Sequence, residues 1–431
     1  MIRGHVGQWP DTSTFLSTGG PMKFLTVLVT ISLMAPSLGA EFRGLPASTL
    51  LGRPRYFPTS IEVTAISGDG STIGGTIMEA GDFDCAGGPC GVSAFVLSLD
   101  TSELLQLGRL PFLSNQYIYP TGVAAFSNDG STSLVSHDSV FYIESALHHG
   151  DVVTQFQQPM SGEGPLHARD MSADAEVVVG TVGEEPFMWN AAQGLEPIPN
   201  LPDVHLDAVA ISADASTILL DYLPVPRGLS SPDGPHNALR WTAGGAVELT
   251  PLAGFDVSIA TALSHDGMVV VGSSDAIPSF ESNPLGSRTR RATAWIGSEA
   301  IALETTSGNS SALDVSADGT SVVGKLDPTT PLTDAFFRPE AMLWRSGRGY
   351  RIKDLLADQY GLGSQLEGWR LSSATTISDD GQVIAGEGIA PDGQRAAWVA
   401  VLTVPEPSAA MLLVTCGAGF LVAMRRTRAE S

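Results

Sequence analysis

The sequence is poor in cysteine and in basic residues, and both shortages exclude whole classes of protein. Three cysteines in 431 residues are too few for a scaffold held together mainly by disulfides. The 23 lysine and arginine residues are outnumbered by 46 aspartates and glutamates, which gives a net charge of −23. Such an acidic surface repels phosphate backbones, so we expect no nucleic acid among its partners.

Motifs of the common enzyme mechanisms are missing as well. The sequence contains no G-x-S-x-G, H-E-x-x-H, G-x-x-x-x-G-K-[ST] or C-x-x-C, so these mechanisms have no local support. His148 and His149 are the only neighbouring histidines; we expect an exposed loop there and predict no metal site. Calcium at the acidic segment with Glu79, Asp82 and Asp84 is the alternative to a solvated loop, because calcium prefers several carboxylates close together. We predict no other cofactor.

What the sequence does have is glycine, proline and a repeat. Its 47 glycines and 28 prolines predict many tight turns and therefore many short strands. Seven copies of a Ser-x-Asp box recur 40 to 62 residues apart, each between apolar, β-prone runs. Glycine follows the aspartate in five copies, and Ala175 and Ala215 replace it in the others. The box aspartates are Asp69, Asp129, Asp174, Asp214, Asp266, Asp318 and Asp380.

We interpret the box as the turn of a β-hairpin. Glycine accepts the positive φ that such turns demand, while the Asp and Ser side chains can bond nearby backbone N–H groups. Further along each repeat comes an apolar run that ends in an aromatic residue, then a small polar turn and another apolar run. In five repeats the aromatic residue is tryptophan, namely Trp189, Trp241, Trp295, Trp344 and Trp398.

Four strands in each of seven repeats predict an all-β protein, a β-propeller of seven four-stranded blades. The tryptophans would pack between the blades. The last repeat lacks a visible fourth strand, and we predict that residues 41 to 60 supply it and close the ring. A pair of β-sandwiches or an open solenoid is the alternative. From about residue 61 to 400 the repeats resemble the HAF-type extracellular repeats of bacteria, a resemblance that implies no activity.

Both ends of the chain resemble targeting signals rather than parts of the fold. Residues 22 to 40 have a lysine, an apolar run and small residues at the end, the layout of a secretory signal peptide. Because residues 1 to 21 show no pattern, Met22 is the expected initiator. We divide the chain into a signal peptide (1–40), a propeller ectodomain (41–403) and a C-terminal segment (404–431).

The C-terminal segment combines three features. It begins with Val404, Pro405, Glu406, Pro407 and Ser408, continues as an uncharged run from 409 to 424, and ends with a basic cluster that includes Arg425 and Arg426. The run is long enough for a short transmembrane helix. Together the three features resemble the PEP-CTERM sorting signal of Gram-negative bacteria. The resemblance implies an exosortase as partner at the inner membrane, cleavage near the Pro-Glu-Pro, delivery to the cell surface or extracellular matrix, and a host that makes exopolysaccharide.

Two further features of the predicted ectodomain are a pair of cysteines and a set of long segments between strands. Cys85 and Cys90 are separated by four residues, which permits a disulfide in an exported protein. The long segments 76–93, 222–237, 274–291 and 325–340 join second to third strands, so a propeller would gather them on one face. Arg288, Arg290 and Arg291 lie in one of them and predict a contact with an anion or a uronate. A solvated loop is the alternative.

These observations favour a non-catalytic surface or matrix protein that binds polysaccharide or another surface protein. The alternative is an extracellular polysaccharide hydrolase or lyase with its site in the propeller funnel, and a third interpretation is a spacer. Convergent carboxylates in the funnel would favour the enzyme, whereas apolar and backbone groups alone would favour binding. Fold does not decide between them, because propellers serve many functions.

Overall fold

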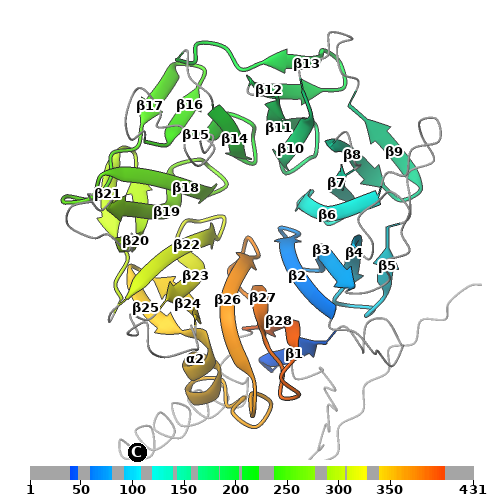
Figure 1. Cartoon of the computed structure of the whole chain (residues 1–431), viewed down its shortest axis with the longest axis vertical. Helices are drawn as coiled ribbons and strands as arrows, with labels where there is room; N and C mark the ends of the chain where they lie inside the picture. Colours follow the sequence, from blue (N-terminus) through cyan, green and yellow to red (C-terminus); the bar gives the residue numbers. More distant parts are fainter. Residues whose placement is uncertain are drawn as a thin grey trace, which may run out of the picture. The chain divides into compact units, whose positions relative to one another are not determined.

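The computed structural model describes residues 39–46, 59–79, 92–107, 119–138, 143–156, 164–183, 185–202, 206–222, 237–276, 289–305, 308–327 and 339–402. Within them, seven four-stranded antiparallel sheets stand around a central axis (Figure 1). The chain is therefore an all-β, seven-bladed β-propeller, as the repeat predicts.

Six blades place their strands in chain order from the axis outwards, and blade 7 does so for its first three strands. The innermost strands are β2 (Thr59–Ile66), β6 (Tyr119–Phe126), β10 (Leu166–Met171), β14 (Leu206–Ile211), β18 (Val257–Leu263), β22 (Asn309–Val315) and β26 (Arg370–Ile377). The second strands are β3 (Thr72–Glu79), β7 (Thr132–Asp138), β11 (Val177–Val182), β15 (Thr217–Tyr222), β19 (Val269–Ala276), β23 (Ser321–Asp327) and β27 (Val383–Ile389).

The outermost strands are short, with three to five residues each. The third strands are β4 (Val92–Ser98), β8 (Ile143–His149), β12 (Glu185–Asn190), β16 (Leu239–Thr242), β20 (Thr289–Ile296), β24 (Glu340–Arg345) and β28 (Arg395–Val401). The outermost strands are β5 (Leu104–Gln106), β9 (Val152–Gln155), β13 (Gly194–Pro197), β17 (Gly245–Glu248), β21 (Glu299–Ala302), β25 (Arg348–Arg351) and β1 (Glu41–Leu45). A short helix, α2 (Ile352–Asp358), follows β25.

The ring closes through β1, which is the outermost strand of blade 7. It pairs antiparallel with β28, and Glu41 stands opposite Val401. The first described strand of the chain thus completes the sheet of the last three. This confirms the predicted closure by the segment after residue 40, and the strand itself covers only Glu41–Leu45.

The Ser-x-Asp box is the turn between the first and second strands. In blade 6, Ser316 Oγ donates to Asp318 Oδ1 (2.7 Å) and accepts the N–H of Ser321 (3.0 Å), while Asp318 Oδ1 also accepts the N–H of Thr320 (3.0 Å). All seven boxes form the same three bonds. The next residue has a positive φ, which is 72° at Gly319 and still 57° and 58° at Ala175 and Ala215.

The boxes also bond to one another. Backbone N–H groups donate to the carbonyl of the middle residue of the next box around the whole ring, at 2.8 to 3.2 Å. The seven bonds run Asp379→Gly68, Asp69→Asn128, Asn128→Ala173, Ala173→Ala213, Ala213→His265, His265→Ala317 and Ala317→Asp379. We call this closed circuit the box belt. Because each box occupies the same place in its blade, one repeated turn holds every blade to its neighbour.

The repeated tryptophans pack between blades, with one departure from the predicted register. Trp189, Trp241, Trp295 and Trp344 all pair with the second residue of the neighbouring strand. In the last three, the indole N–H donates to a backbone carbonyl just after the outermost strand of the previous blade. For Trp344 this acceptor is the carbonyl of Glu304, at 2.8 Å. Trp398 stands two residues earlier in its strand, opposite the fourth residue of β27, at the place that Phe95 holds in blade 1.

Blade 2 replaces the tryptophan by a histidine. His148 pairs with Ser133, the residue equivalent to the partners of the four tryptophans. Burial lowers the pKa of His148. His149 Nδ1 lies 2.9 Å from the hydroxyl of Thr132. Both histidines therefore lie in strand β8, and the exposed loop predicted for them is wrong.

Several predicted features lie outside the described residues. They are the segment 1–38 with Met22, the pair Cys85 and Cys90, and residues 403–431, which include Val404 to Ser408, the run 409–424 and Arg425 and Arg426. Among the helices that the structure describes, none is long and apolar enough to cross a membrane.

Candidate functional site: the central channel

The innermost strands surround a channel with a cavity of about 260 Å³. Each of these strands has a β-bulge three residues before its box serine. The bulge and the two residues after it turn toward the axis, so the repeat lines the channel seven times over. Most of the lining residues are apolar, and alanine is the commonest, for example Ala125, Ala210 and Ala262.

Three bulge residues are threonines, and each bonds to the next blade. The hydroxyl of Thr64 donates to the carbonyl of Val123 (2.5 Å), Thr261 to Ala312 (3.0 Å) and Thr375 to Val63 (2.7 Å). These hydroxyls reach across junctions 1–2, 5–6 and 7–1. These three hydroxyl protons therefore join neighbouring blades, in addition to the backbone bonds of the box belt, and are not available as donors to a ligand in the channel.

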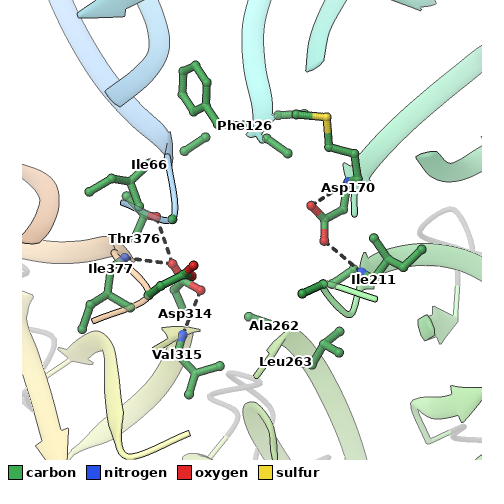
Figure 2. Close-up of a pocket in the computed structure, with 18 of the residues that line it drawn as sticks. Ile66, Phe126, Asp170, Ile211, Ala262, Leu263, Asp314, Val315, Thr376 and Ile377 are labelled. Carbon is green, nitrogen blue, oxygen red and sulfur yellow. Dashed lines mark hydrogen bonds between the residues drawn. The ribbon is translucent and has the colours of Figure 1, made fainter. Parts of the chain in front are cut away.

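Two carboxylates, Asp170 and Asp314, occupy the position that is alanine or threonine in the other blades, two residues before the box serine. Figure 2 shows both side chains directed into the channel from opposite sides. Asp170 accepts the N–H groups of Met171 (2.8 Å) and of Ile211 in the next blade (2.9 Å). Asp314 accepts the N–H groups of Val315 and Ile377 (both 2.8 Å). The hydroxyl of Thr376 also donates to Asp314, at 2.9 Å.

The environment of the two carboxylates favours their neutral forms. Both side chains are half-buried and open only to the channel. Desolvation by the surrounding blades is the largest effect on them and outweighs the lowering by the bound N–H groups. It raises the pKa of Asp170 to about 7 and that of Asp314 to about 6. The charge of Asp314 raises the pKa of Asp170 further.

One mouth of the channel is ringed by the middle residues of the boxes. Most are small, but Asn128, His265 and Asp379 carry polar side chains. His265 Nε2 lies 3.0 Å from Asp379 Oδ2, and this bond raises the pKa of His265. Gly68 leaves room for these groups, because a Cβ there would lie 1.9 Å from Asn128 Oδ1 and 2.3 Å from Asp379 Oδ2. Polar groups from blades 2, 5 and 7 therefore meet at this mouth.

The described arginines among those predicted to contact an anion, Arg290 and Arg291, do not line the channel. Arg290 lies on β20 and forms an ion pair with Asp275, which is fully buried; its Nη2 is 2.7 Å from Asp275 Oδ2. Arg291 donates to the hydroxyl of Thr305, and Arg288 lies outside the described residues. The guanidinium of Arg290 is thus already engaged inside its own blade.

The predicted long segments leave the fold at the face away from the boxes. They follow the ends of β3, β15, β19 and β23, and each of these strands begins at its box. Most of their residues, including Asp82 and Asp84, lie outside the described part of the chain. Within that part, no three His, Cys, Asp or Glu side chains are grouped so that they could hold a metal ion.

Sequence reasoning missed Asp170 and Asp314, although a signal was present. When the boxes are aligned, the residue two places before the serine is alanine in four copies and threonine in one. Aspartate at an otherwise small channel position is the departure that marks both residues. Their location in the channel follows only from the closed ring.

A scan of family models and a search of curated proteins find no match to the chain. Among solved structures, an oligogalacturonate lyase in complex with manganese is similar, with 14% identity and a TM-score of 0.51 over 85% of this chain and 97% of that one. An oligogalacturonate lyase from Vibrio parahaemolyticus has 12% identity and a TM-score of 0.49, over 85% and 98% of the two chains.

TolB from Acinetobacter baumannii has 12% identity and a TM-score of 0.37. The similarity covers 82% of this chain but 66% of TolB, less than two thirds of its length. At such identities these similarities show the β-propeller fold alone.

Proposed function

We propose that this chain is an exported, non-catalytic β-propeller that binds polysaccharide or another surface protein at the cell surface or in the extracellular matrix. One observation carries the non-catalytic part. The channel's carboxylates and threonine hydroxyls bond the backbone of adjacent blades. Groups used in this way stabilise the ring, which leaves recognition of partners to the outer surface.

The export and sorting part rests on the resemblance of residues 404–431 to a PEP-CTERM signal. It is supported by the position of the described chain ends, since Glu41 is paired with Val401 at the outer edge of blade 7. The two ends of the described chain therefore lie together at blade 7, away from the channel. In this proposal an exosortase of a Gram-negative, exopolysaccharide-producing bacterium handles the tail at the inner membrane.

The binding part is tested with the full chain and a panel of extracellular polysaccharides. Retention on the polymer is measured by co-sedimentation, and new reducing ends are measured in the same samples. We expect retention without new reducing ends. Retention of no polymer and of no surface protein from the producing bacterium would contradict the proposal.

The sorting part is tested in a host with and without an exosortase. Alanines in place of Pro405, Glu406 and Pro407 are compared with the unchanged tail by cell fractionation and by the mass of the mature protein. We expect surface delivery and a shorter C-terminus only with the intact motif and the exosortase. The same location and mass in all four cases would overturn this part.

A second candidate function, an extracellular polysaccharide hydrolase or lyase, is favoured by Asp170 and Asp314. Two carboxyl groups that face one channel, one with a pKa near neutrality, match the general acid and base of glycoside cleavage. New reducing ends that disappear in Asp170→Asn and in Asp314→Asn, but not in a Thr261→Ser control, would favour the enzyme over the binding protein.

A further inference from the structure

Basic residues are unevenly distributed around this acidic ring. In the described part of blades 1 to 4, two arginines accompany eighteen aspartates and glutamates. Eight of the twelve described lysines and arginines belong to blades 6 and 7: Arg43, Lys325, Arg345, Arg348, Arg351, Lys353, Arg370 and Arg395. Within the described residues, the cations that attract an anion are therefore concentrated in these two blades.

Three of these cations converge on one cleft. A cavity of about 260 Å³ lies between the start of β24, the end of β25 with α2, and the start of β26. Arg351, Lys353 and Arg370 line it beside Glu340 and Asp354. These strand ends are the ends away from the boxes, so the cleft opens on the face from which the long segments leave. Figure 1 shows α2 beside β25 and β26 at this place.

The cations differ in how far they are engaged. Arg351 Nε lies 2.7 Å from Glu340 Oε2 in an exposed ion pair. Lys353 donates one N–H to the backbone carbonyl of Trp369 at 2.6 Å, which leaves two ammonium donors. Arg370 is exposed, and no hydrogen bond or ion pair within the described residues engages its guanidinium. The cleft thus presents one guanidinium that no described residue engages and one ammonium held in position.

The cleft wall behind them is tightly packed. Trp369 packs edge-on against Phe42 of β1, with ring centroids 5.4 Å apart. Gly44 admits the indole so closely that a Cβ there would lie 2.0 Å from it. Strand β1 therefore fixes Trp369, and through its carbonyl it fixes Lys353. Such preorganised donors bind a ligand with less loss of conformational entropy.

We infer that this cleft binds the carboxylate of an anionic saccharide, a uronate residue. A guanidinium can bond a carboxylate in a bidentate manner, and the ammonium adds a second charged donor. Glu340 and Asp354 beside them are acceptors suited to sugar hydroxyls. The saccharide part of this inference rests on the proposed function, whereas the anion part rests on the cleft alone.

The test uses the full chain and two matched ligands in calorimetry, trigalacturonate and its fully methyl-esterified form. We expect the acid to bind at least about tenfold more tightly than the ester, because a charge-assisted bond contributes about that factor. Arg370→Gln should lose about tenfold in affinity for the acid. Arg348→Gln is the control, since it removes an equal charge from an exposed site on β25 outside the cleft.

The outcomes separate the two proposals. Equal binding of acid and ester, or equal losses in both variants, would overturn the uronate cleft even if polymers are retained. Binding of trigalacturonate that depends on Arg370 would support the cleft even if no polymer and no surface protein is retained, and then the proposed function alone would fail. Lys353→Met checks the result with a second cleft residue, and circular dichroism confirms that each variant is folded.

Discussion

The two faces of the ring differ in how far they follow the repeat. On the box face, seven turns repeat the same three side-chain bonds, and one belt of backbone bonds joins them all. On the other face the described residues differ from blade to blade: α2 follows blade 6, and the cleft with Arg351, Lys353 and Arg370 lies between blades 6 and 7. Repetition suits a scaffold, because every copy can form identical bonds. A site that recognises one ligand needs the departures from the repeat.

The largest effect is expected from acid, which acts on many boxes at once. The N–H of Ser131, then the hydroxyl of Ser127, lower the pKa of Asp129 to about 2. The box serine, then the backbone N–H, also lower the pKa of Asp174 and Asp318. A lowered folded-state pKa contributes stability that is present above about pH 4 and is lost as the pH falls towards 2. The melting temperature should drop steeply over that range.

The channel carboxylates should act in the opposite direction. Their folded-state pKa values, about 7 for Asp170 and about 6 for Asp314, exceed the unfolded value of about 4. Stability should therefore decline as the pH rises from about 4 to 7, which places the maximum near pH 4 to 5. Melting temperatures from pH 2 to 9 check both the loss of stability below about pH 4 and the decline above it, which we call the upper limb of the curve. In Asp314→Asn the upper limb should become shallower, and an unchanged limb would contradict the assignment.

The next largest effect concerns one turn of the box face. Gly319→Ala forces a side chain into a residue with φ of 72° and places its Cβ 2.6 Å from Val269 Cγ2 of blade 5. The left-handed conformation alone costs about 1–2 kcal/mol, and the close approach adds to it. We expect a loss of about 2–3 kcal/mol in chemical denaturation. Gly347→Ala is a control, with a similar φ but open space around it.

A smaller loss is expected at one blade junction. Asp314→Ala removes the acceptor of the Ile377 and Val315 N–H groups. Because the position is open to the channel, water can replace part of these bonds, and we expect a loss of about 1–2 kcal/mol at pH 5. Asp314→Asn retains an acceptor and should lose less. Equal losses in the two variants would show that the bonds to the next blade do not matter.

Ala175→Gly and Ala215→Gly should change stability in the other direction. Both alanines hold the positive φ that glycine adopts in the other five boxes. Relief of that strain exceeds the added chain entropy, so we expect a gain of about 0.5 kcal/mol for each substitution. Thermal unfolding of the single and double variants checks this, and a departure from additivity would measure coupling between these two adjacent boxes, which the Ala173→Ala213 bond joins.

The smallest effect is expected on the other face. Arg370→Gln removes an exposed side chain without a described partner, so the free energy of unfolding should change by less than about 0.5 kcal/mol. Urea denaturation of this variant beside Gly319→Ala measures the contrast between the faces directly. A loss of more than about 1 kcal/mol would mean that the cleft is part of the scaffold.

Much of the scaffold could be predicted from sequence because it repeats. Local chemistry was enough to identify the box as a turn, since Ser316, Asp318 and Gly319 interact within a few residues. The register of Trp398 was not predictable in this way. In β28 this residue pairs with Gly386, the fourth residue of β27, and its ring stacks on Phe42 of β1, a strand more than 350 residues away in the sequence.

The candidate sites were harder to predict for the same reason. Arg290 looked free in a basic stretch, but its partner Asp275 lies across a strand pair, where sequence separation gives no warning. Arg351, Lys353 and Arg370 were not singled out, because they come from two blades and an intervening helix. A cleft between elements has no local pattern of its own.

The sequence by itself determined the repeat unit, the number of blades and the chemistry of the turn, because each of these depends on neighbours along the chain. Only the tertiary structure decided which residues face the axis, how the boxes join into a belt, and which charges share a cleft. Those relations arise when seven similar units close into a ring, since closure brings into contact residues that the sequence holds tens to hundreds of positions apart.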